Sequence, residues 1–547
     1  MKNTLYILFS LLLLSITGCN EDNFLEEKPE DNIYANNLFQ NYDGFVNAMN
    51  AVYSWVREER SRADNIPLTR CTCWNAGVDN AFLNNGHSAM TFLNWPTHIY
   101  TDQYIFENMF DWLYRIINSC NMIINRAEDE KVNWMGNNET DDEYRKNNIV
   151  AQARLIRAWA YRHLTYGWGD VPLSIDEIDG SNYSNDWSRN SVAEIREQME
   201  KDLIFAKENL PLRDDNPGNA NAAVAIHYLA ELYLAMDRYS EAVTTAKELC
   251  ESSEYQLMTE RFGSEANNPG VPFMDLFINP LPSEGNKEVL WALLNTEPEN
   301  VAYGNEDNNY MKNMWQTYYS KDQTIKKLDL QVFYTNNGGK GAGRTSITAP
   351  TFGLYEAQDD RFSDYAIKWY LLMPNNEGGM DTVLWTNTDH EITDGKYDLD
   401  HYQWPSTRKW EYVHPNVSNA SSSDQFDSQM YIRLAETYLI LAEALYKDNK
   451  SDEAATWINK VRERSNATPI TASNIDIDFI LDERSRELLT EEDRRHTLIR
   501  TDKLVERVQL YNDFAGPTIA DAPKYFPIPQ KVIDANTGSV MQQNDGY

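Results

Sequence analysis

Cysteine, positive charge and long apolar segments are all scarce in this chain of 547 residues. Five cysteines are too few for disulfide bonds to carry the fold of a chain this long. The 49 Lys and Arg residues face 84 Asp and Glu residues, which gives a net charge of −35. Because phosphate groups and anionic lipids are bound through Lys and Arg, this charge argues against nucleic acid as a partner and against charge-driven docking on a membrane.

The common catalytic and metal-binding motifs are also missing from the sequence. The eight histidines form no HExxH motif and no other close metal-ligand pair, and the sequence has no G-x-S-x-G turn and no P-loop. His163 and His227 fall in helical patterns, which favours a hydrogen-bonded packing role. Among 84 acidic residues, carboxylate pairs arise by chance and are no sign of a glycosidase. We therefore predict a protein that is not an enzyme, with no catalytic residue, metal or cofactor.

Two short segments carry oxygen-rich side chains that could bind calcium, and each also has a structural explanation. Asn474, Asp476 and Asp478 have the spacing of the first ligands of a calcium loop, but the turn glycine is absent, so the start of a helix explains them better. Residues 304–309 could surround calcium in a loop, and a solvated turn is the simpler explanation. The sequence thus gives no support for a structural calcium ion.

The first 19 residues have the pattern of an export signal. Lys2 precedes an apolar run from Leu5 to Ile16, which is too short to span about 30 Å of hydrocarbon. This run ends at Gly18-Cys19, which resembles a bacterial lipobox, where the cysteine is acylated and becomes the first residue. An ordinary signal peptide followed by an incidental cysteine is the alternative. We predict a signal peptide over 1–18, a lipid anchor on Cys19 and a polar tether over 19–36.

Helical periodicity dominates the rest of the chain. Apolar residues recur every three or four positions between Ala435 and Tyr446, and Ser451 can cap a second helix whose inner face carries Ala454, Ile458 and Val461. The segment from Ala230 to Ala242 repeats the pattern of Ala442 to Ala454. This repeat predicts two helix hairpins of the tetratricopeptide type, with intervals between them too wide for a continuous solenoid.

The predicted fold is mainly α, with tetratricopeptide-like hairpins as a scaffold and long loop-rich insertions carrying a few short strands. Further helices are expected at 43–56 and 152–164, and a capping box at Ser191 opens one that Pro211 stops. We predict a helical N-terminal region over 37–266 and a C-terminal region over 267–547. The latter divides into a loop-rich part (267–427), a helical part (428–510) and a tail (511–547).

Several motifs resemble the SusD/RagB family of outer-membrane nutrient-uptake lipoproteins, and they occur in the family's order along most of the chain. These motifs are Phe24-Leu25-Glu26, Ala153-Arg154 to Ala158, Tyr166-Gly167 to Leu173, Arg433-Leu434-Ala435-Glu436, Ala442-Glu443-Ala444, Pro527-Ile528-Pro529-Gln530 and Gln543 to Tyr547. The sequence departs from the family at Arg495-His496-Thr497, where an aromatic residue and Asp are usual, and at Asp545, where Pro is common.

The resemblance implies a tetratricopeptide scaffold and partnership with a SusC-like TonB-dependent transporter, over which the lipoprotein lies as a lid. It also implies a glycan ligand, or a peptide in some relatives. Sugar rings stack on aromatic side chains while amides and carboxylates bind their hydroxyls. Two segments with this composition occupy the chain positions of the family's variable binding loops. The candidate ligand-binding residues are Trp74, Asn75, Asp79, Trp95, Trp315, Tyr318 and Tyr319.

From this resemblance and the lipobox we predict a non-catalytic glycan-binding lipoprotein. It would lie on the outer membrane through the lipid on Cys19, face the cell exterior, and deliver oligo- or polysaccharide to the transporter. Oligopeptide capture for the same kind of transporter is the alternative, a surface glycoside hydrolase is favoured less, and a scaffold without a small ligand is a further possibility. The sequence does not name the glycan.

Overall fold

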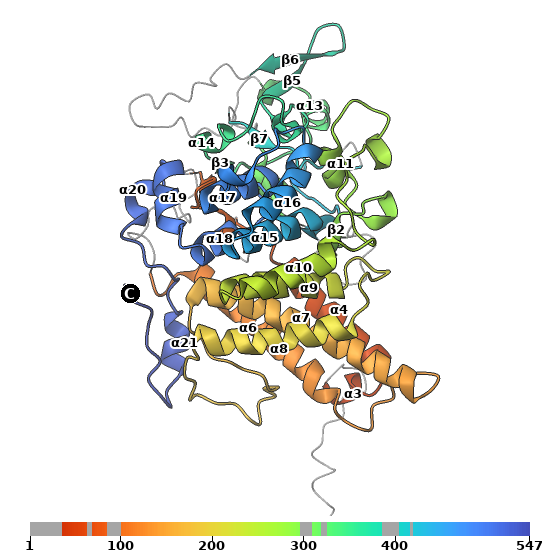
Figure 1. Cartoon of the computed structure of the whole chain (residues 1–547), viewed down its shortest axis with the longest axis vertical. Coiled ribbons are helices and arrows are strands. Elements are labelled where there is room, and N and C mark those ends of the chain that lie inside the picture. Colours follow the sequence, from red (N-terminus) through yellow and green to blue (C-terminus); the bar gives the residue numbers. More distant parts are fainter. Residues whose placement is uncertain are drawn as a thin grey trace, which may run out of the picture.

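The computed structural model describes residues 35–62, 68–84, 100–295, 309–318, 325–384, 404–415 and 420–547. It is mainly helical, with only short strands, which confirms the predicted fold class (Figure 1). Within these ranges, no helix is both long enough and apolar enough to cross a membrane.

The helix ends follow the capping residues of the sequence. In α4 (Tyr42–Arg57), the side chain of Asn41 accepts a hydrogen bond from the Gly44 amide at 3.1 Å. Helix α8 (Val192–Asn209) begins with the predicted capping box, in which the Ser191 amide donates to the Glu194 carboxylate at 2.8 Å. Both caps satisfy amides that have no partner within the helix.

The predicted cap at Ser451 is wrong by one residue. Helix α16 (Ser451–Arg464) includes Ser451 as its first residue, and Lys450 takes the N-cap position without a side-chain bond. The tight turn before it is the reason. Asn449 adopts a left-handed conformation with φ of 60°, and the Lys450 amide donates to the Leu445 carbonyl at 2.8 Å. This turn closes the hairpin without any help from Ser451.

The remaining helices of the described residues fall into two groups by length. The longer ones are α6 (Tyr104–Arg126), α7 (Glu139–Trp168), α9 (Ala222–Ala235), α10 (Tyr239–Cys250), α15 (Leu434–Lys447), α17 (Ile477–Glu487) and α19 (Leu504–Tyr511). The shorter ones are α3 (Ala35–Leu38), α5 (Thr72–Asn75), α11 (Pro272–Ile278), α12 (Met311–Trp315), α13 (Leu330–Asn336), α14 (Ala349–Phe352), α18 (Arg494–Arg500), α20 (Gly516–Ile519) and α21 (Gln530–Ala535).

The longer helices stack into one array in the order α6, α7, α8, α9, α10, α15, α16 (Figure 1). The two predicted hairpins, α9–α10 and α15–α16, are neighbours in it, and the Tyr438 hydroxyl donates to the Cys250 carbonyl across their boundary at 3.4 Å. The expectation that wide intervals would prevent a continuous array is therefore wrong. Residues 251–433, called the insertion below, leave the array after α10, and the chain returns to the array at α15. The two hairpins are therefore far apart in sequence but adjacent in space.

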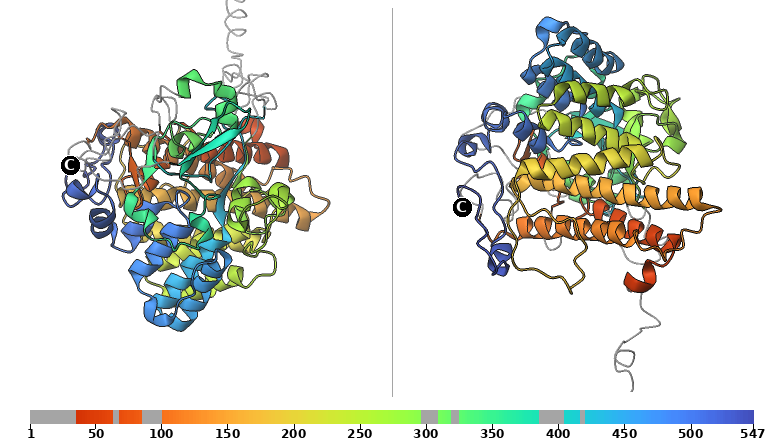
Figure 2. Two further views of the ribbon diagram at one scale, coloured as in Figure 1. Left: turned by 90° about the horizontal axis from the view of Figure 1, so that it is seen from above. Right: turned by 60° about the horizontal axis from the view of Figure 1, so that its bottom comes forward.

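In the described part of the chain, the strands form four antiparallel pairs, which are β1 (Ala81–Leu83) with β3 (Thr345–Ile347), β2 (Val289–Leu293) with β8 (Gln429–Arg433), β4 (Ile367–Lys368) with β7 (Ser406–Thr407), and β5 (Tyr370–Pro374) with β6 (Met380–Leu384). The pair β2–β8 joins the beginning and the end of the long insertion just before α15. The β5–β6 hairpin lies at the end of the molecule away from α8 (Figures 1 and 2).

A network of buried ion pairs fixes the insertion to the helix array. Its centre is Glu487 on α17, whose carboxylate meets Arg433 at 2.5 Å, Arg361 at 3.1 Å and also Arg464. Burial alone would oppose ionisation, but these three guanidinium groups hold the pKa of Glu487 well below its usual range. The buried ion-pair network consists of Glu288, Asp359, Arg361, Arg433, Arg462, Arg464, Glu483 and Glu487.

Removing the central carboxylate should destabilise the protein strongly. We predict that Glu487→Gln lowers the free energy of unfolding by about 3–5 kcal/mol, because buried guanidinium groups then lose their counter-charge. Urea denaturation measures the change. As a matched control, Glu248→Gln removes a surface partner of Lys207 and should cost less than about 1 kcal/mol. Equal effects of the two substitutions would contradict a central role for Glu487.

Candidate ligand-binding cleft

Trp74, a predicted ligand-binding residue, lies in the core. Its side chain is 0% exposed, and its ring stacks on His163 at a centroid distance of 5.1 Å. His496 and Phe526 contact it at 4.7 and 6.0 Å. Because protein surrounds this ring, it has no free face for a sugar, and its position in the structure argues against the predicted contact.

Asn75 and Asp79, also predicted to bind ligand, are buried as well, and Asp79 has a structural role. The Asp79 carboxylate pairs with Arg494 at 2.7 Å and with Arg507 at 2.7 Å. Burial alone would raise its pKa, but the two guanidinium groups lower the pKa of Asp79 to about 2. These pairs connect the segment before β1 to α18 and α19, and they leave the carboxylate engaged within the protein.

The second predicted segment is only partly accessible. Trp315 is buried at the end of α12, and Tyr318 is half-buried. Trp95, Tyr319 and the predicted anchor Cys19 lie outside the described residues. The structure therefore does not assemble these candidates into one exposed site.

A polar cleft of about 690 Å³ lies instead between α6 and the insertion. Residues from α6, from the end of α4 and from two segments of the insertion line it. They are Glu58, Ser61, Arg62, Arg70, Tyr104, Glu107, Asn108, Asp111, Trp112, Arg115, Tyr310, Asn313, Ser423 and Asp424. None of the sequence-predicted candidates among the described residues belongs to this lining.

One wall of the cleft is the polar stripe of α6. Tyr104, Asn108, Asp111 and Arg115 follow one another at helical spacing, while the opposite face of α6 is buried in the core. Tyr104 is 44% exposed and so presents an aromatic surface at the cleft. Burial raises the pKa of Asp111, against the opposing effect of Lys531. This wall offers one aromatic ring and several hydrogen-bonding groups.

The facing wall comes from the insertion and is held by a buried lysine. The Lys312 ammonium, on α12, donates to the Asp424 carbonyl at 2.9 Å, and the Asn313 side chain donates to the Ser423 carbonyl at 2.8 Å. Burial lowers the pKa of Lys312 to about 8. Together the two bonds position Ser423 and Asp424 beside Tyr310 at the edge of the cleft.

Charged and aromatic side chains are in contact at the cleft. Arg70 pairs with Glu58 at 3.2 Å and lies over the Trp112 ring at 5.2 Å. Arg115 lies over the Trp55 ring at 5.8 Å. Guanidinium, carboxylate, amide and phenol groups in one cleft suit a ligand with many hydroxyl groups.

The cleft could not be predicted from the sequence because its residues belong to regular helices and short loops. Trp112, which lines the cleft, is only 2% exposed. The signal that was present is the polar stripe of α6, in which Tyr104 stands in line with Asn108 and Asp111.

The calcium alternative at Asp476 is explained by a helix start, as favoured from the sequence. The Asp476 side chain accepts a hydrogen bond from the Phe479 amide at 2.7 Å and caps α17. Asp478 pairs with Lys503 and Arg507. Residues 304–308 of the other candidate loop lie outside the described residues.

Two family models match the chain over most of its length. A model described as "SusD family" matches residues 287–547, and one described as "Starch-binding associating with outer membrane" matches residues 23–234. The chain belongs to the SusD/RagB family, as its motifs predicted.

Curated relatives are distant but match from end to end. The SusD-like protein P2 of Formosa agariphila is 22% identical, over 99% of both chains. A SusD-like protein of Bacteroides ovatus is 23% identical, over 99% of this chain and 95% of its own.

Solved structures share the fold. A SusD homolog from Bacteroides thetaiotaomicron has a TM-score of 0.70 at 20% identity, covering 95% of this chain and all of its own. A laminarin-binding SusD-like protein has a TM-score of 0.67 at 20% identity over 93% of this chain and 100% of its own. Surface glycan-binding protein A from Bacteroides thetaiotaomicron, in complex with laminarihexaose, has a TM-score of 0.67 at 19% identity over 92% of this chain and 99% of its own.

The buried position of Trp74 makes its substitution a test of stability. We predict that Trp74→Ala lowers the free energy of unfolding by about 3–5 kcal/mol, because it leaves a large cavity in the core. The half-buried Trp187 is the matched control, and Trp187→Ala should cost clearly less in the same urea denaturation. A stable Trp74→Ala protein that had lost only ligand affinity would instead favour the role predicted from sequence.

Proposed function

We propose that this chain is a non-catalytic surface glycan-binding protein and that the cleft beside α6 holds the glycan. The observation that carries the proposal is the cleft itself, which combines an exposed Tyr104 with amide and charged groups from two walls. Support comes from relatives of the same fold that bind laminarin or laminarihexaose. A sugar ring would stack on Tyr104, and Asn108 and Asp111 would bind its hydroxyls.

The acidic residues of the cleft support binding more than hydrolysis. Glu107 pairs with Lys531 at 2.8 Å, and Asp111 lies 3.7 Å from the same ammonium. A glycosidase needs one carboxyl group as proton donor and a second as base or nucleophile. These two carboxylates instead share one ammonium group, which engages both of them in ion pairs within the protein.

The proposal includes a lipid anchor on Cys19 and delivery of the glycan to a SusC-like TonB-dependent transporter. The family description that names association with the outer membrane supports this location. Capture of oligopeptides for the same kind of transporter is the alternative, since the charges of the cleft also suit peptide groups.

Glycan binding is tested by titrating the purified protein with laminarihexaose, other oligosaccharides and peptides while following tryptophan fluorescence. We predict a saturable response to a glycan, weakened about tenfold by Tyr104→Ala because an aromatic stacking contact is lost. Tyr144 is the matched control, because it is 57% exposed on α7 and does not line the cleft. A response to peptides alone would support the alternative. Equal glycan affinity of the wild type and Tyr104→Ala would show that the glycan does not bind in this cleft.

The anchor has its own test. In cells fed a labelled fatty acid, wild-type protein should carry the label and sediment with the outer membrane, whereas Cys19→Ala should carry no label. Labelling that is equal in the two proteins would refute acylation at Cys19.

A further inference from the structure

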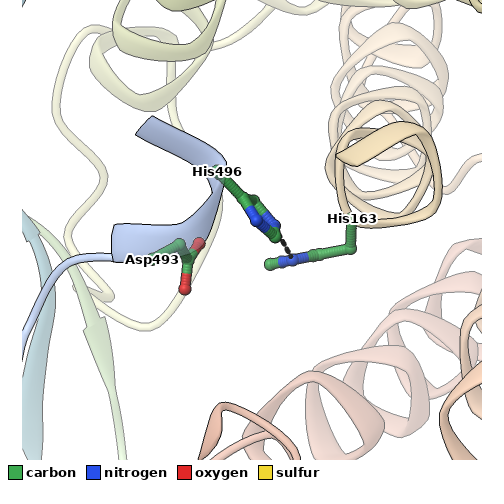
Figure 3. A group of neighbouring side chains, drawn as sticks. All are labelled: His163, Asp493 and His496. Atoms are coloured by element: carbon green, nitrogen blue, oxygen red, sulfur yellow. Dashed lines mark hydrogen bonds between the residues drawn. The ribbon is translucent and has the colours of Figure 1, made fainter. Parts of the chain in front are cut away.

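Two histidines and an aspartate converge in the core (Figure 3). His163 lies on α7, His496 on α18, and Asp493 directly precedes α18. His163 Nδ1 and His496 Nε2 are 3.0 Å apart, and one ligand atom from each of the three side chains lies within 4.8 Å of the others. Both histidines are 0% exposed.

Three buried polar atoms around this group lack a hydrogen-bond partner among the described residues. They are the outer nitrogens of the two rings, His163 Nε2 and His496 Nδ1, and the Oε1 atom of Glu59. Glu59 is 1% exposed, and its Oε1 lies 3.8 Å from His163 Nε2. Buried polar atoms are nearly always paired, so three unpaired atoms around one histidine pair mark this contact as one that hydrogen bonds do not fully satisfy.

We propose that His163, His496 and Asp493 bind a divalent first-row transition metal ion such as Zn²⁺, with Glu59 as the outer partner of His163. Imidazole nitrogen and carboxylate oxygen are ligands that such ions accept. The proposal stands apart from glycan binding, because none of these residues lines the cleft.

The arrangement of the two rings suits a metal between them. With both nitrogens about 2.0–2.1 Å from an ion, their present separation corresponds to a ligand–metal–ligand angle of roughly 90°, and a small outward shift would make it tetrahedral. Each neutral ring carries one proton. With the metal between the inner nitrogens, both protons reside on the outer nitrogens, and that of His163 faces the Glu59 carboxylate, as in metal sites with a carboxylate behind the histidine.

The charged groups around the site are of both signs. Arg162 lies near both rings, and Arg495 lies near His496. Arg162 donates to Oδ2 of Asp493 at 2.6 Å, so that Oδ1 would bind the ion. The neighbouring acids Glu59, Asp493 and Glu231 match the guanidinium groups Arg60, Arg162 and Arg495 in number.

The metal would join distant parts of the chain. His163 and His496 are 333 positions apart, and they belong to the segments matched by the two different family models. An ion between α7 and α18 would therefore fasten the helix array to the C-terminal helices, and its release should lower thermal stability.

The test is metal analysis of the full-length protein, unfolded and refolded with Zn²⁺ or Co²⁺ and then passed through a desalting column. We expect about one equivalent of retained metal per chain, Co²⁺ absorption bands typical of nitrogen and oxygen ligands, and a higher melting temperature than after refolding with a chelator. His496→Gln and Asp493→Asn should lose the metal and the gain in melting temperature.

His227 provides a matched control. It is equally buried, shares one hydrogen bond of 2.9 Å with the Thr437 hydroxyl, and has the Glu436 carboxylate 3.8 Å from its Nε2. No second histidine among the described residues adjoins it. His227→Gln should keep the metal. Wild-type protein that retains no Zn²⁺ or Co²⁺ and melts at the same temperature with and without them would overturn the proposal, whatever the variants do. Retention that survives Asp493→Asn and His496→Gln would also overturn it.

Discussion

The Glu487 carboxylate holds together three arginines that the chain supplies from separate places. Arg361 comes from the insertion, Arg433 from the end of β8, and Arg464 from the end of α16. Every side chain in this contact is at most 2% exposed. Charges buried to this degree are tolerated only when each one has its partner, so the network fixes the relative position of all four segments.

The cleft depends on the buried ion-pair network because one of its walls belongs to the helix array and the other belongs to the insertion. Tyr104, Asn108 and Asp111 belong to a helix of the array, whereas Asn313 and Asp424 belong to the insertion. The β2–β8 pair and the buried ion-pair network bring the insertion back to the array. Lys312 then holds the insertion wall in place at Asp424 by donating a hydrogen bond to the backbone carbonyl of that residue. Thus a rigid helical scaffold supplies one wall of the site and positions the segments that supply the other.

Local sequence patterns predicted the helices well, because capping and periodicity act within a few residues. The capping box at Ser191 and the two hairpins are of this kind. Contacts between residues far apart in sequence could not be predicted this way. Periodicity does not reveal that Glu487 meets Arg361 or that α10 packs on α15, and it therefore missed the continuity of the array.

The candidate site shows the same limit for aromatic residues. Trp74 and Tyr104 both stand near polar residues in the sequence, yet Trp74 packs against His163 and His496 while Tyr104 is exposed. Composition cannot separate the two cases, since large aromatic side chains serve cores and binding sites alike. Only the position of α6 against the insertion identifies the exposed ring.

The most direct test of glycan binding in this cleft is a crystal structure of the protein with laminarihexaose, or with whichever glycan binds most tightly in solution. We expect sugar density in the cleft, with one ring against Tyr104 and hydroxyls within hydrogen-bond distance of Asn108 or Asp111. Density at another surface, with the cleft beside α6 left unchanged, would contradict it.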